Sequence, residues 1–169
     1  MKKKFLIRLR PFINGGEDMA VNIKVVKNVT SVTTYQDAIR STGHVLIDAE
    51  YVKPEYIEAC INRESDFPTG LQLPDGIGVA IPHGDAELVK ESSLSVLRID
   101  APVLFGLMED REQKIPVSLV FHLALSSGGD HIKMLRKLMR FLQDDDFMTQ
   151  CKQLNASKLE EYLFPKFND

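Results

Sequence analysis

Residues 117–125 read VSLVFHLAL, a run in which Ser118 and His122 are the polar side chains. A run this apolar is typical of a strand that is buried on both faces at the centre of a sheet. Gly128-Gly129 then interrupts the chain before an amphipathic segment with apolar residues at helical spacing, namely Ile132, Leu135, Leu138, Met139 and Leu142. This stretch predicts a central strand followed by a helix that covers one face of the sheet.

The rest of the chain supplies shorter strands and further helices. Short β-branched or apolar runs predict strands at 23–29, 77–81 and 94–99. Helical spacing and helix-start residues predict helices at 34–46, from Lys53-Pro54 to a turn at 67–70, at 144–154 and at 159–164, the last with a capping box of Ser157 and Glu160. The fold class is therefore α/β, in the broad sense that includes α+β, as a three-layer α/β/α sandwich. Its mixed β-sheet is flanked by helices on both faces.

Composition narrows the class of protein. The 169 residues are 44% hydrophobic and 27% charged, with a formal net charge of −3, as expected for one globular domain. This balance gives no electrostatic reason to expect a nucleic-acid partner. Membrane insertion is not expected, because a spanning helix needs about 20 mostly apolar residues. Cys60 and Cys151 lie far apart without ligand spacing, which predicts two reduced thiols in a cytoplasmic protein.

The first 18 residues differ in charge from the rest. They carry five basic and two acidic side chains, whereas the whole chain is net acidic. We expect residues 1–18 to be an N-terminal arm or a non-native extension, with a natural start at Met19 and a domain over 19–169. The basic start has no uninterrupted apolar region or small-residue cleavage site, so it is not a secretory signal.

Two of the four histidines are better explained by structure than by chemistry. His44 follows Gly43 at the predicted end of a helix, where a surface or capping role is the simplest interpretation. His122 lies among apolar residues of the central strand, where a hydrogen-bonded core residue is the commoner case.

His83 has a different setting. The strand at 77–81 delivers it to the rim of the sheet, Pro82 stiffens the approach, and Gly84 lets the backbone come close to a partner. This pattern is typical of a presented nucleophile, although a histidine in a turn is common.

His131 and Arg63 are ambiguous when each is taken alone. His131 begins the amphipathic helix after Gly128-Gly129-Asp130, where free backbone N–H groups favour an anion, but a first-turn capping residue would also fit. Arg63 closes the second predicted helix, where a solvated arginine would interact favourably with the helix dipole.

Three motifs in order connect these residues to a known family. They are Arg63-Glu64-x-x-Phe67-Pro-Thr69-Gly70, Val79-Ala-Ile-Pro82-His83-Gly84 and Asp130-His131-Ile-x-x-Leu135. Together they resemble the EIIA domain of the sugar phosphotransferase system (PTS), in its fructose/mannitol/nitrogen class, over residues 25–164. The 67–70 turn, the strand from Pro116 and the tail from Leu159 are most similar to galactitol-type proteins. Gly84 departs from that type, in which another small residue can stand there.

The resemblance implies the fold described above and a set of roles. His83 would take a phosphoryl group from phospho-HPr and pass it to a cysteine of the cognate EIIB, which serves the membrane component EIIC. His131 would be the second active-site histidine, and Arg63 the active-site arginine. An imidazole suits this role because its pKa of about 6.5 leaves it largely unprotonated at neutral pH. No metal or cofactor is expected, since the sequence has no carboxylate–histidine cluster at ligand spacing.

Three functions remain open at this point. The first is a transport phosphocarrier for a sugar or sugar alcohol, and the second is a regulatory phospho-relay of the nitrogen type. The third is a binding module whose histidine no longer reacts, although the joint presence of Arg63, His83 and His131 argues against it. The sequence does not identify the transported sugar, the oligomeric state or the phosphorylated imidazole nitrogen.

Overall fold

The computed structural model describes residues 20–29, 31–126 and 128–169. The predicted division at residue 18 and the predicted start at Met19 lie outside these residues. The described chain forms a five-stranded sheet in the order β1-β4-β5-β3-β2. Its strands are β1 (Asn22–Val25), β2 (Gly70–Gln72), β3 (Gly78–Ala80), β4 (Ser93–Gly106) and β5 (Lys114–Ala124). Its helices are α1 (Tyr35–Asp48), α2 (Tyr56–Asp66), α3 (Gly128–Phe141), α4 (Asp145–Gln153) and α5 (Ala156–Asn168), with a short 3-10 helix η1 (Ala86–Leu88).

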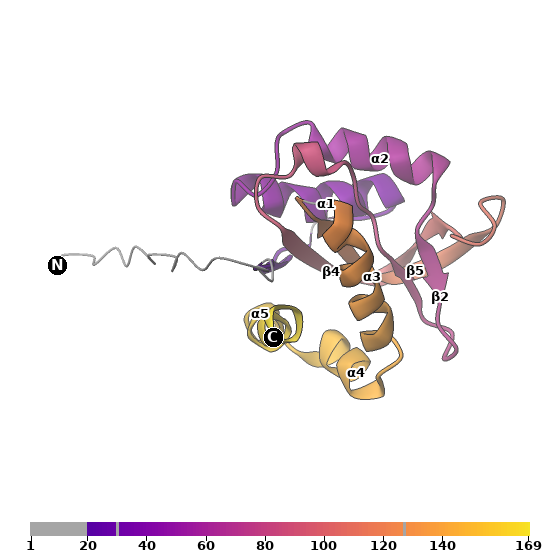
Figure 1. Ribbon diagram of the computed structural model, residues 1–169. Helices are drawn as coiled ribbons and strands as arrows, with labels where there is room; N and C mark the ends of the chain where they lie inside the picture. Colours follow the sequence, from indigo (N-terminus) through magenta and orange to yellow (C-terminus); the bar gives the residue numbers. More distant parts are fainter. Residues whose placement is uncertain (1–19, 30, 127) are drawn as a thin grey trace.

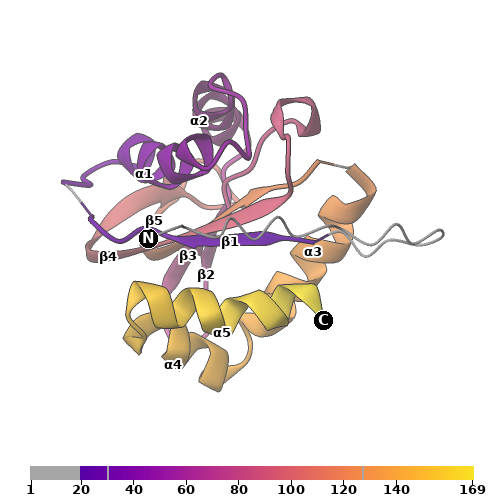
Figure 2. The same ribbon diagram turned by 90° about the vertical axis from the view of Figure 1, so that its left-hand side faces the viewer.

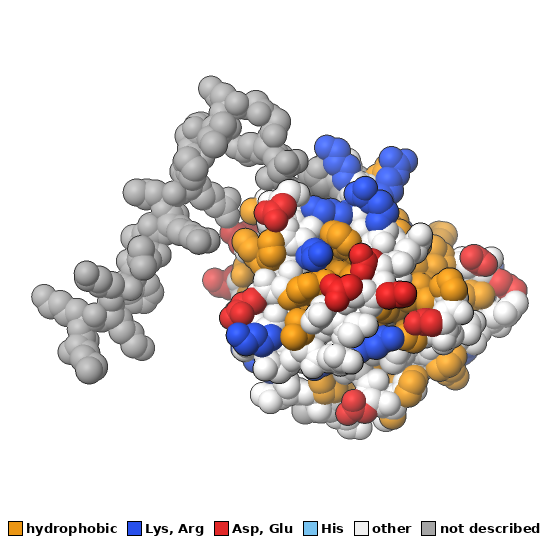
Figure 3. Space-filling model, turned by 90° about the horizontal axis from the view of Figure 1, so that it is seen from below, with side chains coloured by type: hydrophobic (Ala, Val, Ile, Leu, Met, Phe, Trp, Pro, Cys, Tyr) orange, Lys and Arg blue, Asp and Glu red, His pale blue; other side chains and the backbone are white. Residues whose placement is uncertain are grey.

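Helices cover both faces of this sheet. Helices α1 and α2 lie over one face, and α3, α4 and α5 lie over the other (Figures 1 and 2). Apolar residues of β4 and β5 pack on α1 through one cluster, and a second cluster joins the opposite face to Leu138, Phe147 and Leu163 of the three C-terminal helices. Seen from the side of α3, α4 and α5, acidic and basic side chains are interspersed with apolar ones (Figure 3). The predicted three-layer sandwich with a mixed sheet is confirmed.

Strand β5 occupies the middle of the sheet, as the apolar run at 117–125 predicted. It pairs antiparallel with β4 and parallel with β3. The strand predicted at 94–99 is the first half of β4, which continues to Gly106 after an irregularity between Arg98 and Val103. Asp100 and Pro102 made this segment read as the end of a strand, because both residues are uncommon inside one.

Boundaries of other elements also differ from the predicted ones. The first strand ends at Val25, and the following Lys27, Asn28 and Val29 are exposed. Helix α5 begins at Ala156 with Asn155 as its N-cap, whose side chain accepts a hydrogen bond from the Lys158 N–H at 2.9 Å. Ser157 therefore lies inside the helix, and no Ser157–Glu160 capping box forms.

Helix α5 instead makes polar contacts with β1. The Asn168 side chain accepts from the Val21 N–H at 2.7 Å and donates to the Val21 carbonyl at 2.9 Å. The Glu160 carboxylate accepts from the Val25 N–H at 2.9 Å. These bonds satisfy backbone groups on the side of β1 that faces away from β4. In the part of the chain that the structure describes, no helix is both long and apolar enough to cross a membrane.

Arg98 of β4 ties helix α4 to the sheet. Its guanidinium donates hydrogen bonds to the carbonyls of Cys151, Lys152 and Leu154 at the C-terminal end of α4. These are carbonyls that a helix end leaves without intrahelical partners, and a cation is favourable there.

We expect Arg98→Met to lower the free energy of unfolding by about 1.5–3 kcal/mol, since charged hydrogen bonds to partly buried carbonyls are lost. Arg40→Met is the matched control. Arg40 is exposed and its ion pairs to Asp37 and Glu58 measure 3.8 and 4.0 Å, so we expect its loss to cost under about 0.5 kcal/mol. Urea unfolding measures both, and equal effects would contradict the assigned role of Arg98.

Candidate active site

His83 lies in a turn just beyond β3. The Ile81 N–H donates to the Thr69 hydroxyl at 3.1 Å, and the Pro82 carbonyl accepts from the Leu123 N–H of β5 at 3.0 Å. The turn is thus fixed on one side by the 67–70 segment and on the other by the central strand. These bonds hold the half-buried His83 just beyond the C-terminal end of β3.

The ring of His83 has a defined orientation. Its Nδ1 is 2.9 Å from the carbonyl oxygen of Ile81. Because a carbonyl oxygen only accepts, Nδ1 carries the proton, and Nε2 of the neutral ring keeps its lone pair. The side chain is therefore held in the tautomer whose Nε2 can act as a nucleophile.

His131 enters the same site from α3. Its ring packs edge-on against that of His83, with centroids 4.9 Å apart and an interplanar angle of 62°. Its Nε2 is buried and has no hydrogen-bond partner among the described residues. The predicted break at Gly128-Gly129 forms the first residues of α3 itself, so the helix N-terminus lies beside His131.

Arg63 approaches from the last turn of α2. Its guanidinium lies 5.6 Å from the centre of the Phe67 ring, and the Arg63 side chain is exposed. Its positive charge contributes to lowering the pKa of His83 and of His131. The structure thus brings His83 and His131 into ring contact, from the turn after β3 and from α3, and Arg63 of α2 lies near enough for its charge to act on the pKa of both.

Both site histidines are held in the uncharged form. Burial is the main cause that lowers the pKa of His83, with smaller contributions from His131 and Arg63, and the bond to Ile81 opposes the shift only in part. Burial also lowers the pKa of His131, followed by the charge of Arg63. At neutral pH the site therefore presents two neutral imidazoles next to one permanent cation.

The buried face of α2 packs against the turn that carries His83. Tyr56, Cys60 and Glu64 recur every four residues and are all buried. The Tyr56 hydroxyl donates to the Leu123 carbonyl at 2.8 Å. A Cβ at Gly84 would lie 2.9 Å from the Cys60 sulfur and 3.1 Å from the Tyr56 ring. The expectation that Gly84 opens the backbone to a partner is therefore wrong, because this buried glycine makes room for α2.

Glu64 and Thr69 are the site residues to which the sequence assigned no role. Thr69 N–H and hydroxyl both donate to the buried Glu64 carboxylate, at 2.7 and 2.9 Å. A signal was available, since the apolar face of α2 carries Tyr56 and Cys60, and four more residues along that face lead to Glu64. The charged run Arg63-Glu64 concealed it, because such a run is typical of a solvated helix end.

His122 is a core residue, as its apolar surroundings predicted. Its Nδ1 is hydrogen-bonded to the Thr42 hydroxyl at 2.7 Å, and the Cys60 thiol lies 3.4 Å from its Nε2. Complete burial lowers the pKa of His122 to about 3, and burial raises the pKa of Cys60 to about 12. The two groups are therefore a neutral, hydrogen-bonded pair in the core. Cys60 and Cys151 are both free thiols.

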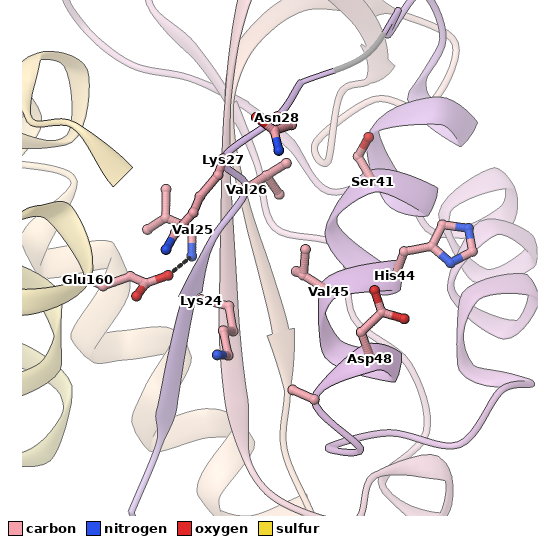
Figure 4. Close-up of a pocket in the computed structure, with 11 residues that line it drawn as sticks. Lys24, Val25, Val26, Lys27, Asn28, Ser41, His44, Val45, Asp48 and Glu160 are labelled. Atoms are coloured by element: carbon pink, nitrogen blue, oxygen red, sulfur yellow. Dashed lines mark hydrogen bonds between the residues drawn. The ribbon is translucent and has the colours of Figure 1, made fainter. Parts of the chain in front are cut away.

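His44 lies apart from these residues. It is exposed on α1, which continues to Asp48 beyond the predicted end of that helix. A hollow of about 540 Å³ lies beside it, lined by Lys24, Lys27, Ser41, His44, Asp48 and Glu160 among others (Figure 4). In Figure 4 the His44 ring points away from Glu160. Within the described ranges, no group of three or more His, Cys, Asp or Glu side chains is arranged to hold a metal ion.

Comparison with known proteins agrees with this geometry. The family model described as phosphoenolpyruvate-dependent sugar phosphotransferase system, EIIA 2, matches residues 19–164. The mannitol-specific phosphotransferase enzyme IIA component of Enterococcus faecalis is 34% identical over 146 residues, 84% of this chain and 94% of the relative. The galactitol-specific EIIA component of Escherichia coli is 30% identical over 138 residues, 82% of this chain and 91% of the relative.

A regulatory relative and a solved complex also match. A nitrogen regulatory protein of Bradyrhizobium diazoefficiens is 38% identical over 109 residues, 63% of this chain and 64% of the relative. The structure of mannitol enzyme IIA with phosphorylated mannitol enzyme IIB of Escherichia coli has a TM-score of 0.61 and 25% identity, and the match covers 85% of this chain and 94% of that one. The chain therefore belongs to the EIIA 2 family of the phosphoenolpyruvate-dependent sugar phosphotransferase system, a family of phosphoryl-transfer proteins.

Proposed function

We propose that this chain is a phosphocarrier that takes a phosphoryl group from phospho-HPr onto His83 and passes it to a cysteine of its cognate EIIB. Through EIIB it would serve a membrane EIIC in the uptake of a sugar or sugar alcohol, as in the galactitol-type and mannitol-type relatives. The observation that carries the proposal is the Nδ1–Ile81 hydrogen bond, which leaves Nε2 of a neutral His83 unprotonated beside His131.

The proposed chemistry is two in-line transfers. In the first, the Nε2 lone pair of His83 attacks phosphorus, the new N–P bond forms, and the bond to HPr breaks. In the second, the EIIB thiolate attacks the same phosphorus and His83 recovers its Nε2 lone pair. A loose phosphoryl transition state needs alignment and charge neutralisation more than covalent help, so these residues suffice without a metal.

Arg63 and His131 would stabilise the phosphoryl oxygens. A guanidinium presents several N–H donors in one plane, which suits a phosphoryl group better than the point charge of a lysine. The unpartnered, buried Nε2 of His131 is available for a hydrogen bond to an oxygen. Backbone N–H groups at the start of α3 favour the same negative charge.

Partner docking would use the apolar rim of the site. Phe67 and Ile132 are large apolar side chains that stay 66% and 58% exposed, each close in sequence to a proposed site residue. HPr and EIIB must both reach His83, so we propose that they share this surface in turn. A small apolar patch with a charged rim suits transient partners.

A regulatory phospho-relay is the second candidate, supported by the similarity to a nitrogen regulatory protein. Genes for an EIIB and an EIIC beside this one would favour the transport function. An isolated gene, together with a phosphorylation state that changes a regulatory output, would favour the relay.

We expect His83→Ala and His83→Gln to abolish phosphorylation by Enzyme I, HPr and phosphoenolpyruvate while the fold is retained. The label on the wild-type chain should be lost in acid and kept in alkali, as for an N–P bond. His44→Ala, which changes an exposed histidine of α1, is the control and should label normally. Acid-labile label on His83→Ala would refute the assignment.

Arg63→Ala and His131→Ala should slow loading without preventing it, since neither residue is the nucleophile. Loss of a charged hydrogen bond of about 1.5–3 kcal/mol corresponds to about ten- to hundredfold in rate if the bond acts fully in the transition state. Rapid-quench measurement of single turnovers with phospho-HPr and with EIIB checks both directions, with Arg40→Ala as the control. Wild-type rates in both directions would remove these residues from the mechanism.

Gly84→Ala should lower the unfolding free energy by about 1–3 kcal/mol and slow loading, because its methyl group overlaps the Cys60 sulfur. In a chain that also carries Cys60→Ala, the same change should cost less. A double-mutant cycle on stability measures this coupling. If the two substitutions lower the free energy of unfolding additively, contact with Cys60 of α2 is not what excludes a larger residue at position 84.

A further inference from the structure

Glu64 is a buried carboxylate directly behind the nucleophile turn. Its side chain faces inward from α2 and is only 4% exposed, whereas the preceding Arg63 points to solvent. Burial of a charged carboxylate is costly unless it is well hydrogen-bonded. Among the described residues, its hydrogen-bond donors belong to Thr69, whose N–H and hydroxyl donate to the carboxylate oxygens.

Thr69 connects the Glu64 carboxylate to the turn that carries His83. Its hydroxyl has one proton, which goes to Glu64, and its oxygen accepts from the Ile81 N–H at 3.1 Å. Ile81 is thus held through its N–H, while its carbonyl receives the Nδ1 proton of His83 at 2.9 Å. Three successive hydrogen bonds therefore connect the Glu64 carboxylate to the ring of His83.

This connection rests on the proposed role of His83. We propose that Glu64 is a positioning residue for phosphoryl transfer: through Thr69 it fixes the Ile81 carbonyl, which selects the Nδ1–H tautomer and aims Nε2 of His83. Thr69 is the intermediate in this arrangement. Neither side chain contacts the reacting atoms.

The arrangement makes loading sensitive to pH near neutrality. Burial raises the pKa of Glu64 to about 7, against the opposing effects of the Thr69 bonds and of Arg63. Arg63 of its own helix is the charged group that acts on it, and Thr69 of the 67–70 turn supplies neutral donors. The neighbouring Cys60 thiol is uncharged, and the charge of Glu64 contributes to raising its pKa. Protonation puts a hydrogen on a carboxyl group that otherwise only accepts, and it removes the charge that strengthens the bonds from Thr69. We therefore expect the hold of Thr69 on Ile81 to weaken.

The sign of the effect follows from these pKa values. Above pH 7 the ionised carboxylate holds Thr69 and loading is fast, and loading slows as the pH falls through about 7. Protonation of His83 itself occurs lower, because its pKa is below the ordinary value. Glu64→Gln keeps the shape and one acceptor but cannot ionise, so the variant should lose the step near pH 7.

The test compares wild type, Glu64→Gln, Thr69→Val and Thr69→Ser as full-length chains. Single-turnover loading from phospho-HPr is measured between about pH 6 and 8.5. At each pH the wild-type rate is divided by the variant rate, so that any titration of phospho-HPr itself affects both rates equally and cancels. We expect Glu64→Gln and Thr69→Val to load about tenfold more slowly at pH 8, the equivalent of one hydrogen bond. The ratio should shrink with an apparent pKa of about 7. Thr69→Ser keeps the hydroxyl and should load like wild type.

A second measurement does not depend on phosphorylation. Imidazole ¹⁵N shifts report the tautomer of His83, which should be Nδ1–H in wild type and in Thr69→Ser. We expect a mixture of tautomers in Glu64→Gln and Thr69→Val. Glu58→Gln is the matched control, because Glu58 lies on the same helix with a side chain 68% exposed. In this variant neither the tautomer of His83 nor the pH profile of loading should change.

The outcomes separate this proposal from the proposed function. Suppose that wild type is phosphorylated on His83, and that Glu64→Gln and Thr69→Val show the wild-type tautomer of His83 and the wild-type pH profile of loading. Glu64 then does not position the ring, and the proposal fails. If wild type is not phosphorylated at all, the proposed function fails, and the ¹⁵N shifts still decide whether Glu64 orients the ring. A Glu64→Gln chain that does not fold leaves Thr69→Val against Thr69→Ser as the deciding pair.

Discussion

Complete burial of the second half of β5 is the constraint on which the other elements depend. This strand is apolar on both faces, so helices must cover it from both sides, and its backbone must find partners in β4 and β3. Its last residues also anchor the active-site turn. Leu123 donates its N–H to Pro82 and receives the Tyr56 hydroxyl on its carbonyl. The same strand thus organises the core and, through the bond to Pro82, fixes the position of the turn that carries His83.

Chemistry at the site follows from this burial. Two ionisable groups are held in a buried setting, which lowers the pKa of His83 and raises the pKa of Glu64 to about 7. Both shifts have desolvation as their largest cause. The result is a neutral imidazole with a free lone pair above a carboxyl group poised between its two protonation states. Arg63 supplies the positive charge from the exposed rim, where it needs no buried counter-ion.

The sequence predicted the layers of the fold but not every boundary. The apolar run of β5 and the spacing in α3 are strong signals because burial itself creates them. Strand β2 was not predicted: it begins at Gly70, the last residue of the predicted turn at 67–70, and its pairing with β3 depends on a contact that no local pattern encodes. The approach to His83 was visible from the strand and the proline that precede it, whereas the role of Gly84 was misinterpreted, because its contact with α2 is not a local feature of the sequence. That His131 and Arg63 lie near it depends on the packing of α3 and α2, which no local pattern encodes. Their proximity was expected only through the family resemblance that the three ordered motifs carry. Glu64 stayed hidden because the charged run Arg63-Glu64 is typical of a solvated helix end, although its spacing from Tyr56 and Cys60 places it on the buried face of α2.

The contacts between α5 and β1 have a consequence for association with other chains. An outermost strand normally offers unpaired N–H and C=O groups on which another extended segment can add, and this is a common route to edge-to-edge aggregation. Here the Asn168 amide occupies both hydrogen-bonding positions of Val21, as a neighbouring strand would, and Glu160 blocks Val25 with a negative charge. The helix therefore takes up backbone groups of Val21 and Val25 that a further strand would need, which disfavours extension of the sheet at this border.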